Sequence, residues 1–382
     1  MEDLVGRAEG LAYDLEFTTV RQWKEKNPTA MAVGILPVYA PREILHASGH
    51  LPVGIVGGGD RLEIIRGDAY FQSYICRLPR SVIELALSGR LDCIEGFLFP
   101  SICDVIRNLS GMFQVLFPDR YVHYFDYPQN FDPAVGGRFY RRELERLVED
   151  FGARASAEDL RRSIRIYNQN RRAIRALYEL RGKQPWKLPA SEVYVVVRAG
   201  NVLPVAEHTR LVEDYATLAE AASDRPQRDH VRVVLCGGFC EQPPLGLIRT
   251  LERAGCYVVE DDLTLGPRWI TADVEEEGDP LEALTRAFLE HSVETASLFK
   301  ATGEKGEALV EAVRRTGAQG VIFASPSFCD PALLDRPMMQ AAMDRAGIPH
   351  TSFKYAENLG QFHGIREQAG TFSDSIRLWG QA

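Results

Sequence analysis

The sequence lacks both a long hydrophobic run and a basic N-terminus. Its apolar stretches, such as AMAVGILPV and LPVGIVGGG, contain proline or glycine and fall short of the roughly 20 residues that cross a bilayer. The opening residues, MEDLVGRAEG, have neither the positive start nor the apolar centre of a secretory signal. We therefore expect a cytoplasmic protein without a membrane-spanning segment.

Positive charge and nucleotide-binding motifs are also scarce. Forty-four Lys and Arg residues face 53 Asp and Glu residues, a net charge of -9, so we expect no nucleic-acid partner. No G-x-x-x-x-G-K-[ST] string occurs, and the glycines of GIVGGGD do not fit G-x-G-x-x-G, so ATP should be handled by another protein. The cysteines number seven, which in a reducing compartment predicts free thiols or metal ligands and no disulfide framework.

The order of apolar and polar segments predicts an α/β fold. Buried-looking runs such as AMAVGILPV and HVRVVLCG alternate with amphipathic stretches in two parts of the chain, which is typical of parallel sheets covered by helices. A charged, purely helical pattern separates these parts, and Ser156 with Asp159 resembles a capping box. We expect two Rossmann-like parallel-sheet domains with helical connecting segments.

This pattern divides the 382 residues into four segments. They are an N-terminal helical segment at 1–29, a first α/β domain at 30–135, a helical connector at 136–187 and a second α/β domain at 188–382. Ligands of open α/β sheets gather at the carboxyl ends of the strands, so we expect the functional site there.

Three cysteines stand at such strand ends. Cys103, Cys240 and Cys329 each follow a predicted strand by four or five residues, and each lies in the order small residue, bulky apolar residue, Cys, acid. Backbone N–H groups and the positive end of a helix dipole stabilise thiolates at such turns. Three converging turns would form an electron-rich pocket for an iron–sulfur cluster or for zinc.

The residues alone leave other interpretations open. Strand-to-helix turns favour small residues and helix starts favour acids, so a cysteine there could simply be tolerated. The long intervals, from 103 to 240 and from 240 to 329, differ from the C-x-x-C pairs of zinc ribbons and ferredoxins and leave the metal undecided. We expect the other cysteines to be small buried hydrophobes; these are Cys76, Cys93, Cys236 and Cys256.

The remaining polar candidates have simpler interpretations. Asp104, Glu241 and Asp330 are interpreted as carboxylates at helix starts, and His123 and His363 as hydrogen-bonded packing residues. We therefore assign no catalytic acid from the sequence.

Six longer motifs give the sequence a family resemblance. They are FLFPSICDVIRNLSGM, FDYPQNF, GGFCEQPPLGLI, DDLTLGPRW, VIFASPSFCDPALLDRP and SFKYAENLGQ. Over nearly its full length the chain resembles the small iron–sulfur subunits, those of the C type, of ATP-dependent benzoyl-CoA reductases. These belong to the 2-hydroxyacyl-CoA dehydratase family, as its D-component.

The resemblance implies a cofactor, a function and partners. In that family the motif cysteines hold a [4Fe-4S] cluster, which here falls on Cys103, Cys240 and Cys329, in the crevice between the two domains. The implied function is ATP-driven low-potential electron transfer for the two-electron dearomatisation of benzoyl-CoA to a cyclic dienoyl-CoA. The implied partners are a larger homologous iron–sulfur subunit, ATP-hydrolysing electron activator subunits, ferredoxin as upstream donor and an aromatic acyl-CoA substrate.

Two other functions stay open at this point. One is the small subunit of a 2-hydroxyacyl-CoA dehydratase with the same cluster, which recycles its activating electron, whereas a reductase consumes two electrons and ATP at each turnover. The other is a non-redox metal-binding or assembly protein that holds zinc, or nothing, at these cysteines.

Overall fold

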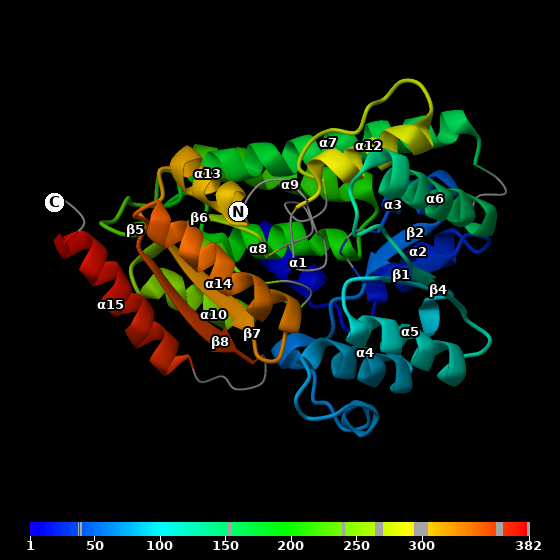
Figure 1. Cartoon of the computed structure of the whole chain (residues 1–382), viewed down its shortest axis with the longest axis horizontal. Coiled ribbons are helices and arrows are strands. Elements are labelled where there is room, and N and C mark those ends of the chain that lie inside the picture. Colours follow the sequence, from blue (N-terminus) through cyan, green and yellow to red (C-terminus); the bar gives the residue numbers. More distant parts are fainter. Residues whose placement is uncertain are drawn as a thin grey trace.

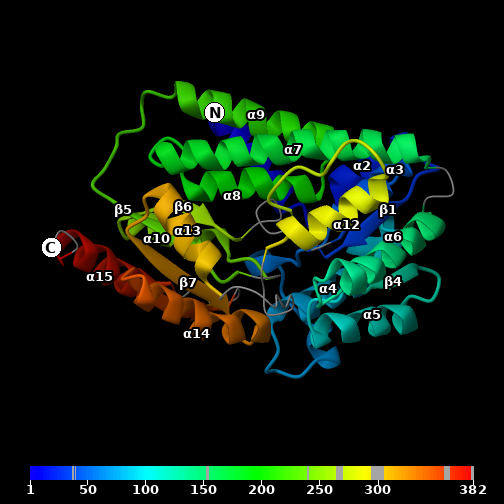
Figure 2. The same ribbon diagram turned by 45° about the horizontal axis from the view of Figure 1, so that its top comes forward.

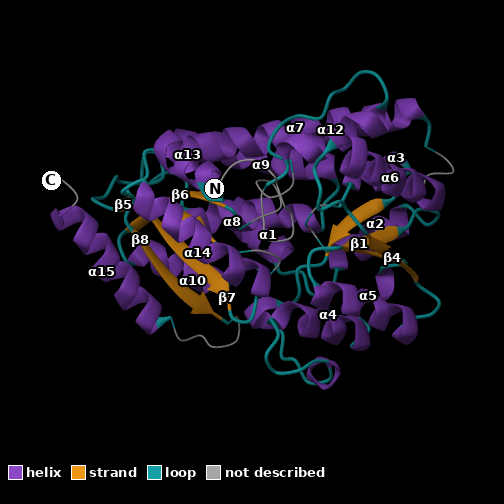
Figure 3. Ribbon diagram, in the orientation of Figure 1, coloured by secondary structure: helices purple, strands orange, loops and turns teal. Residues whose placement is uncertain are grey.

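The computed structural model describes residues 1–36, 38, 40–151, 155–238, 241–263, 270–293, 305–356 and 362–379. Two sheets lie toward opposite ends of the long axis, and the helix α7 (Ala157–Lys183) runs along both of them (Figure 1). Turning the molecule keeps α7 beside the two halves (Figure 2). Colouring by secondary structure shows each sheet flanked by helices (Figure 3).

Each sheet has four strands, and every pairing is parallel. The strand orders are β2-β1-β3-β4 and β6-β5-β7-β8, so the two sheets share one topology. The strands of the first sheet are β1 (Ala32–Ile35), β2 (Leu51–Gly54), β3 (Gly96–Pro100) and β4 (Tyr121–Phe125). Those of the second are β5 (Val231–Cys236), β6 (Cys256–Asp261), β7 (Gly320–Pro326) and β8 (His350–Tyr355). The expected pair of Rossmann-like parallel sheets is confirmed, and the strand order reverses between β1 and β3 and between β5 and β7.

Helices connect and cover the strands. Those that precede α7 in the sequence are α1 (Glu2–Ala12), α2 (Thr18–Lys26), α3 (Arg42–Ala47), α4 (Arg77–Leu87), α5 (Asp104–Leu116) and α6 (Arg138–Phe151). After α7 come α8 (Ala190–Arg198), α9 (Val205–Ala221), α10 (Leu245–Arg253), α12 (Pro280–His291), α13 (Glu307–Thr316), α14 (Asp330–Arg345) and α15 (His363–Trp379). No helix in the described ranges is both long and apolar enough to cross a membrane.

The helix α7 is fixed to both halves by buried ion pairs. It begins with the expected capping box of Ser156 and Asp159. Arg171 pairs with Glu43 of α3 beside the first sheet, and Arg181 pairs with Asp261 at the end of β6, where nitrogen and oxygen are 2.6 Å apart. Charges this deeply buried are tolerated only when paired, so these contacts fix where α7 crosses each sheet.

Packing also crosses between distant segments. The helix α1 packs on α8 beside the second sheet, and its Ala8 and Ala12 belong to the core there. The helix α12 returns to the first half, where Phe288 stacks on Tyr140 of α6 with ring centroids 4.2 Å apart. The boundaries of the four segments given above stay a prediction.

One helix differs from its pattern in a way that matters for the site. The sequence suggests a helix from about residue 69 to 87, but α4 begins only at Arg77, after a 3-10 turn at Gly67–Tyr70. Cys76 is therefore the residue that precedes the helix, and not a residue of its interior.

Candidate functional site

The carboxyl ends of the two sheets face a common cavity of about 610 Å³. Its walls come from the start of α4, the β3–α5 turn and the end of β4 on one side, and from Glu241 and the β7–α14 turn on the other. The residues that line it include Cys76, Leu78, Ser101, Ile102, Cys103, Asp104, Tyr124, Asp126, Glu241, Phe328, Cys329, Asp330 and Leu334. This is the place where the strand order predicts a ligand.

Cys103 and Cys329 occupy equivalent positions in the two halves. Each follows the third strand of its sheet and precedes a helix, so that each is an N-cap, of α5 and α14 respectively. Burial raises the pKa of the Cys103 thiol, while the N–H groups of Ile106 and Val105 act to lower it. These N–H groups would support a thiolate, as the sequence pattern suggests.

The residue before Cys329 has an unusual backbone conformation. Phe328 has a φ angle of 65° and leaves 51% of its surface exposed. A left-handed conformation costs an ordinary side chain about 1–2 kcal/mol, so the turn adopts it against a local penalty. The result is a sharp turn in which the Cys329 N–H donates to the Pro326 carbonyl at 3.2 Å.

Cys76 joins this site, which the sequence analysis missed. Burial raises the pKa of its thiol well above the usual value, and the nearby Glu241 carboxyl group raises it further. Cys76 lines the cavity together with Glu241, Cys103 and Cys329. A signal was present, because Ile75-Cys76 repeats the apolar-Cys order of Ile102-Cys103. The helical spacing of the following residues concealed it.

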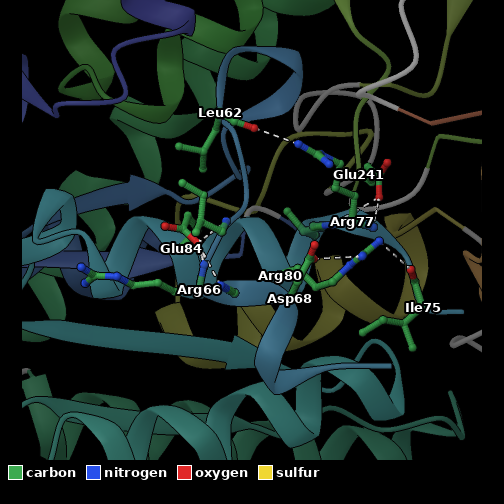
Figure 4. Close-up of polar contacts among 11 residues, drawn as sticks. Leu62, Arg66, Asp68, Ile75, Arg77, Arg80, Glu84 and Glu241 are labelled. Carbon is green, nitrogen blue, oxygen red and sulfur yellow. Dashed lines mark hydrogen bonds and ion pairs between the residues drawn. The ribbon is translucent and has the colours of Figure 1, made fainter. Parts of the chain in front are cut away.

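Glu241 connects the second half to the start of α4. Its Oε2 accepts hydrogen bonds from the N–H groups of Arg77 at 2.8 Å and Leu78 at 3.2 Å (Figure 4). Burial raises the pKa of Glu241 to about 7, and the two N–H groups act in the opposite direction. The expectation of a carboxylate at a helix start is correct in kind, but the helix belongs to the other half of the molecule.

The loop between β2 and α4 is held by side chains of α4 itself. One oxygen of Glu84 accepts from the N–H groups of Ile65, Arg66 and Gly67, at 2.9, 2.6 and 2.8 Å (Figure 4). Two arginines of α4 add contacts from Arg77 to the Leu62 carbonyl and from Arg80 to Asp68 and the Ile75 carbonyl. The segment that ends at Cys76 is thus fixed over most of its length.

The other sequence candidates have different positions. Cys240 lies outside the described residues. Three cysteines do not line the cavity: Cys93, Cys236 and Cys256. Burial raises the pKa of Cys256 to about 12, as expected of a small buried hydrophobe. His123 contacts the Tyr121 hydroxyl at 3.1 Å, and His363 is exposed beside Glu367, so neither lines the cavity.

The chemistry of the cavity lining fits an iron–sulfur cluster. In the part of the chain that the structure describes, no three His, Cys, Asp or Glu side chains come close enough to hold one metal ion. Iron–sulfur clusters are held by cysteine thiolates, and Cys76, Cys103 and Cys329 all line this cavity.

Comparisons with known proteins identify relatives along nearly the whole chain. The family model for the 2-hydroxyglutaryl-CoA dehydratase D-component matches residues 37–376. The chain is 52% identical to the C-type subunit of benzoyl-CoA reductase from Thauera aromatica over 99% of both chains. It is 26% identical to the (R)-phenyllactyl-CoA dehydratase beta subunit of Clostridium sporogenes, over 90% of this chain and 91% of that one. It is 27% identical to the (R)-2-hydroxyglutaryl-CoA dehydratase subunit beta of Acidaminococcus fermentans, over 92% and 94%.

Proposed function

Because this chain belongs to the 2-hydroxyglutaryl-CoA dehydratase D-component family, we propose that it is the iron–sulfur subunit of a benzoyl-CoA reductase. In this role it takes part in ATP-driven, low-potential electron transfer for the two-electron dearomatisation of benzoyl-CoA to a cyclic dienoyl-CoA. The observation that carries the proposal is the 52% identity to a benzoyl-CoA reductase subunit over 99% of both chains. The dehydratase subunits compared above are only 26% and 27% identical, which favours the reductase over the dehydratase alternative.

We place a [4Fe-4S] cluster in the cavity between the two sheets. The family resemblance assigns it to Cys103, Cys240 and Cys329, and the cavity adds Cys76 as a fourth candidate ligand. A bound cluster supplies single electrons at a potential set by charge, hydrogen bonds and exposure. The chain contributes thiols at the starts of α4, α5 and α14 and the carboxyl groups of Asp104 and Asp330, whose negative charge near the cluster would lower that potential.

We also propose that the protein works in a complex. The relatives are named as subunits of reductases and dehydratases, which supports a larger homologous iron–sulfur subunit as partner. The sequence has no phosphate-binding loop, so we assign ATP hydrolysis to separate activator subunits that receive electrons from ferredoxin. An aromatic acyl-CoA is the substrate of the complex, and the cytoplasm is its proposed location.

The first test is anaerobic purification of the chain with its co-purifying partners, followed by iron and sulfide analysis. Single changes to alanine at Cys76, Cys103, Cys240 and Cys329 identify the ligands, because each true ligand lowers the iron content when removed. Cys256→Ala is the matched control, since Cys256 is buried in the second core and should leave iron unchanged. A colourless protein without iron contradicts the proposal and favours the zinc or assembly alternative. An iron content that none of the four changes lowers contradicts it as well.

The second test separates the two redox functions. The complete complex is assayed for ATP-dependent reduction of benzoyl-CoA and for dehydration of 2-hydroxyacyl-CoA thioesters. The reductase consumes two electrons in each turnover, whereas the dehydratase needs only an activating electron. Dehydration without net reduction would refute the reductase assignment while leaving the family intact.

A further inference from the structure

The start of α4 lacks a cap from its own chain segment. Cys76 is the N-cap residue, and its side chain makes no capping hydrogen bond. The first N–H groups of any helix have no partner within the helix and, when buried, require an acceptor from elsewhere. At α4 this acceptor is the Glu241 carboxylate, which is 163 and 164 residues away in the sequence from the two groups it binds.

The site cysteines differ in where their neighbouring acid comes from. Cys103 and Cys329 are each followed directly by an aspartate, which is the first residue of the helix that the cysteine precedes. Cys76 is followed by Arg77, so the carboxyl group at the start of α4 is supplied by the other half of the molecule.

The Glu241 carboxylate is held by the second half. Glu241 is 2% exposed, and its backbone carbonyl accepts a hydrogen bond of 2.9 Å from the hydroxyl of Tyr355, at the end of β8. Two residues later the carbonyl of Pro243 accepts another, also of 2.9 Å, from the hydroxyl of Tyr194 in α8. The loop is therefore anchored on two sides, and prolines at 243 and 244 restrict its backbone.

The start of α4, which donates these hydrogen bonds, is held in place by the first half. The loop before Cys76 is bound to α4 through Glu84 and Arg80 (Figure 4). The hydrogen bonds of Glu241 thus join two segments that are each fixed within a different half.

We propose that Glu241 is a positioning residue that sets where Cys76 stands relative to the second sheet, and thereby the spacing of the thiols around the cavity. The residues it binds, Arg77 and Leu78, directly follow Cys76, so a shift of the contact moves that thiol. The role at the cluster rests on the proposed function, whereas the role in placing Cys76 does not.

The test compares two substitutions at this position with a matched control. Glu241→Ala removes both hydrogen bonds, while Glu241→Gln retains a carbonyl oxygen that can accept them. The control is Glu252→Ala, because Glu252 accepts from the N–H of Ser191 at 3.0 Å and so caps α8 within the second half.

The first readout uses iron-free protein and therefore does not depend on the cluster. In Glu241→Ala we expect hydrogen–deuterium exchange of the Arg77 and Leu78 amides to rise about tenfold, the factor that corresponds to about 1.4 kcal/mol. We also expect cross-linking of the free thiols of Cys76 and Cys329 by a short bis-methanethiosulfonate, which forms a disulfide to each thiol and releases methanesulfinate, to change in yield. Glu241→Gln should restore both values, and Glu252→Ala should leave both unchanged.

The second readout is the cluster of the reconstituted complex. Glu241→Ala should lose iron several times faster than the parent protein and change the electron paramagnetic resonance spectrum of the reduced cluster, and Glu241→Gln should restore both. Unchanged exchange and cross-linking in Glu241→Ala overturn the proposal. Faster exchange with unchanged iron retention and an unchanged spectrum overturn its role at the cluster. A parent protein without iron refutes the proposed function and leaves exchange and cross-linking to decide the placement of Cys76.

Discussion

The ion pair between α7 and β6 gives a stability prediction that can be worked through from the structure. Arg181 has 0% of its surface exposed and Asp261 has 7%. Besides Arg181, the Asp261 carboxylate accepts from the Tyr178 hydroxyl at 3.0 Å and from the Leu263 N–H at 3.2 Å. The guanidinium also lies over the Tyr178 ring, 4.2 Å from its centroid. Asp261→Ala would leave this guanidinium buried without its counter-charge.

The expected loss follows from the burial. Removing one partner of a buried ion pair costs about 3–5 kcal/mol, because the remaining charge is neither hydrated nor neutralised. Asp261→Ala should therefore lower the free energy of unfolding by about 3–5 kcal/mol. Replacing both partners with apolar residues, as Arg181→Met with Asp261→Leu, should cost less than the single change, because no charge then stays buried.

Urea denaturation of the iron-free chain measures these differences. The control is Arg172→Ala in the same helix, since Arg172 pairs with Asp273 but has a side chain that is 49% exposed, and such pairs contribute about 0–1 kcal/mol. If Asp261→Ala costs no more than Arg172→Ala, or if the double variant is less stable than Asp261→Ala, the account of α7 as a helix fixed by buried charge is wrong.

Three further predictions concern the site and its supports. Phe328→Gly should raise the free energy of unfolding by up to about 1 kcal/mol, because glycine adopts the left-handed conformation of this residue without strain, whereas Phe328→Ala should not raise it. Equal urea midpoints for the two variants would contradict this explanation. Tyr355→Phe should lower the free energy of unfolding by about 1 kcal/mol through loss of its bond to the Glu241 carbonyl and should speed iron release from the reconstituted complex, and unchanged values of both would argue against that anchor. Burial acts to raise the pKa of Glu84, but the N–H groups of Gly67, Ile65 and Arg66 hold it below its usual value. The ionised Glu84 therefore stabilises the folded state fully above the unfolded pKa of about 4.3, and this stabilisation is lost as the pH falls through the lower folded pKa. The stability difference between the parent and Glu84→Gln, measured by urea denaturation across pH, should shrink below that range, and a constant difference would refute the assignment.

Much of the architecture follows from local sequence patterns. The alternation of apolar strands and amphipathic helices predicts two parallel sheets, because each element must bury one face against the next. Cys103 and Cys329 could be placed at the carboxyl edges from residues within a few positions of each, since a strand end and a helix start are local features.

Other elements depend on their surroundings. Val193 and the valines at 195–197 are typical of a strand, yet they fold as α8, which is buried among α1, α9 and α10. Packing against these three helices stabilises α8 although valine has a low intrinsic helix propensity.

The sequence by itself determined the two parallel sheets and the two thiols that follow their third strands. Only the tertiary structure decided that Cys76 stands with those thiols and that Glu241 caps a helix in the other half. The physical reason is the sequence separation of the interacting residues, because strand and helix signals act over a few neighbouring positions. The helix start after Cys76 is bound instead by a carboxylate more than 160 residues away, which lies beside α4 only in the folded chain.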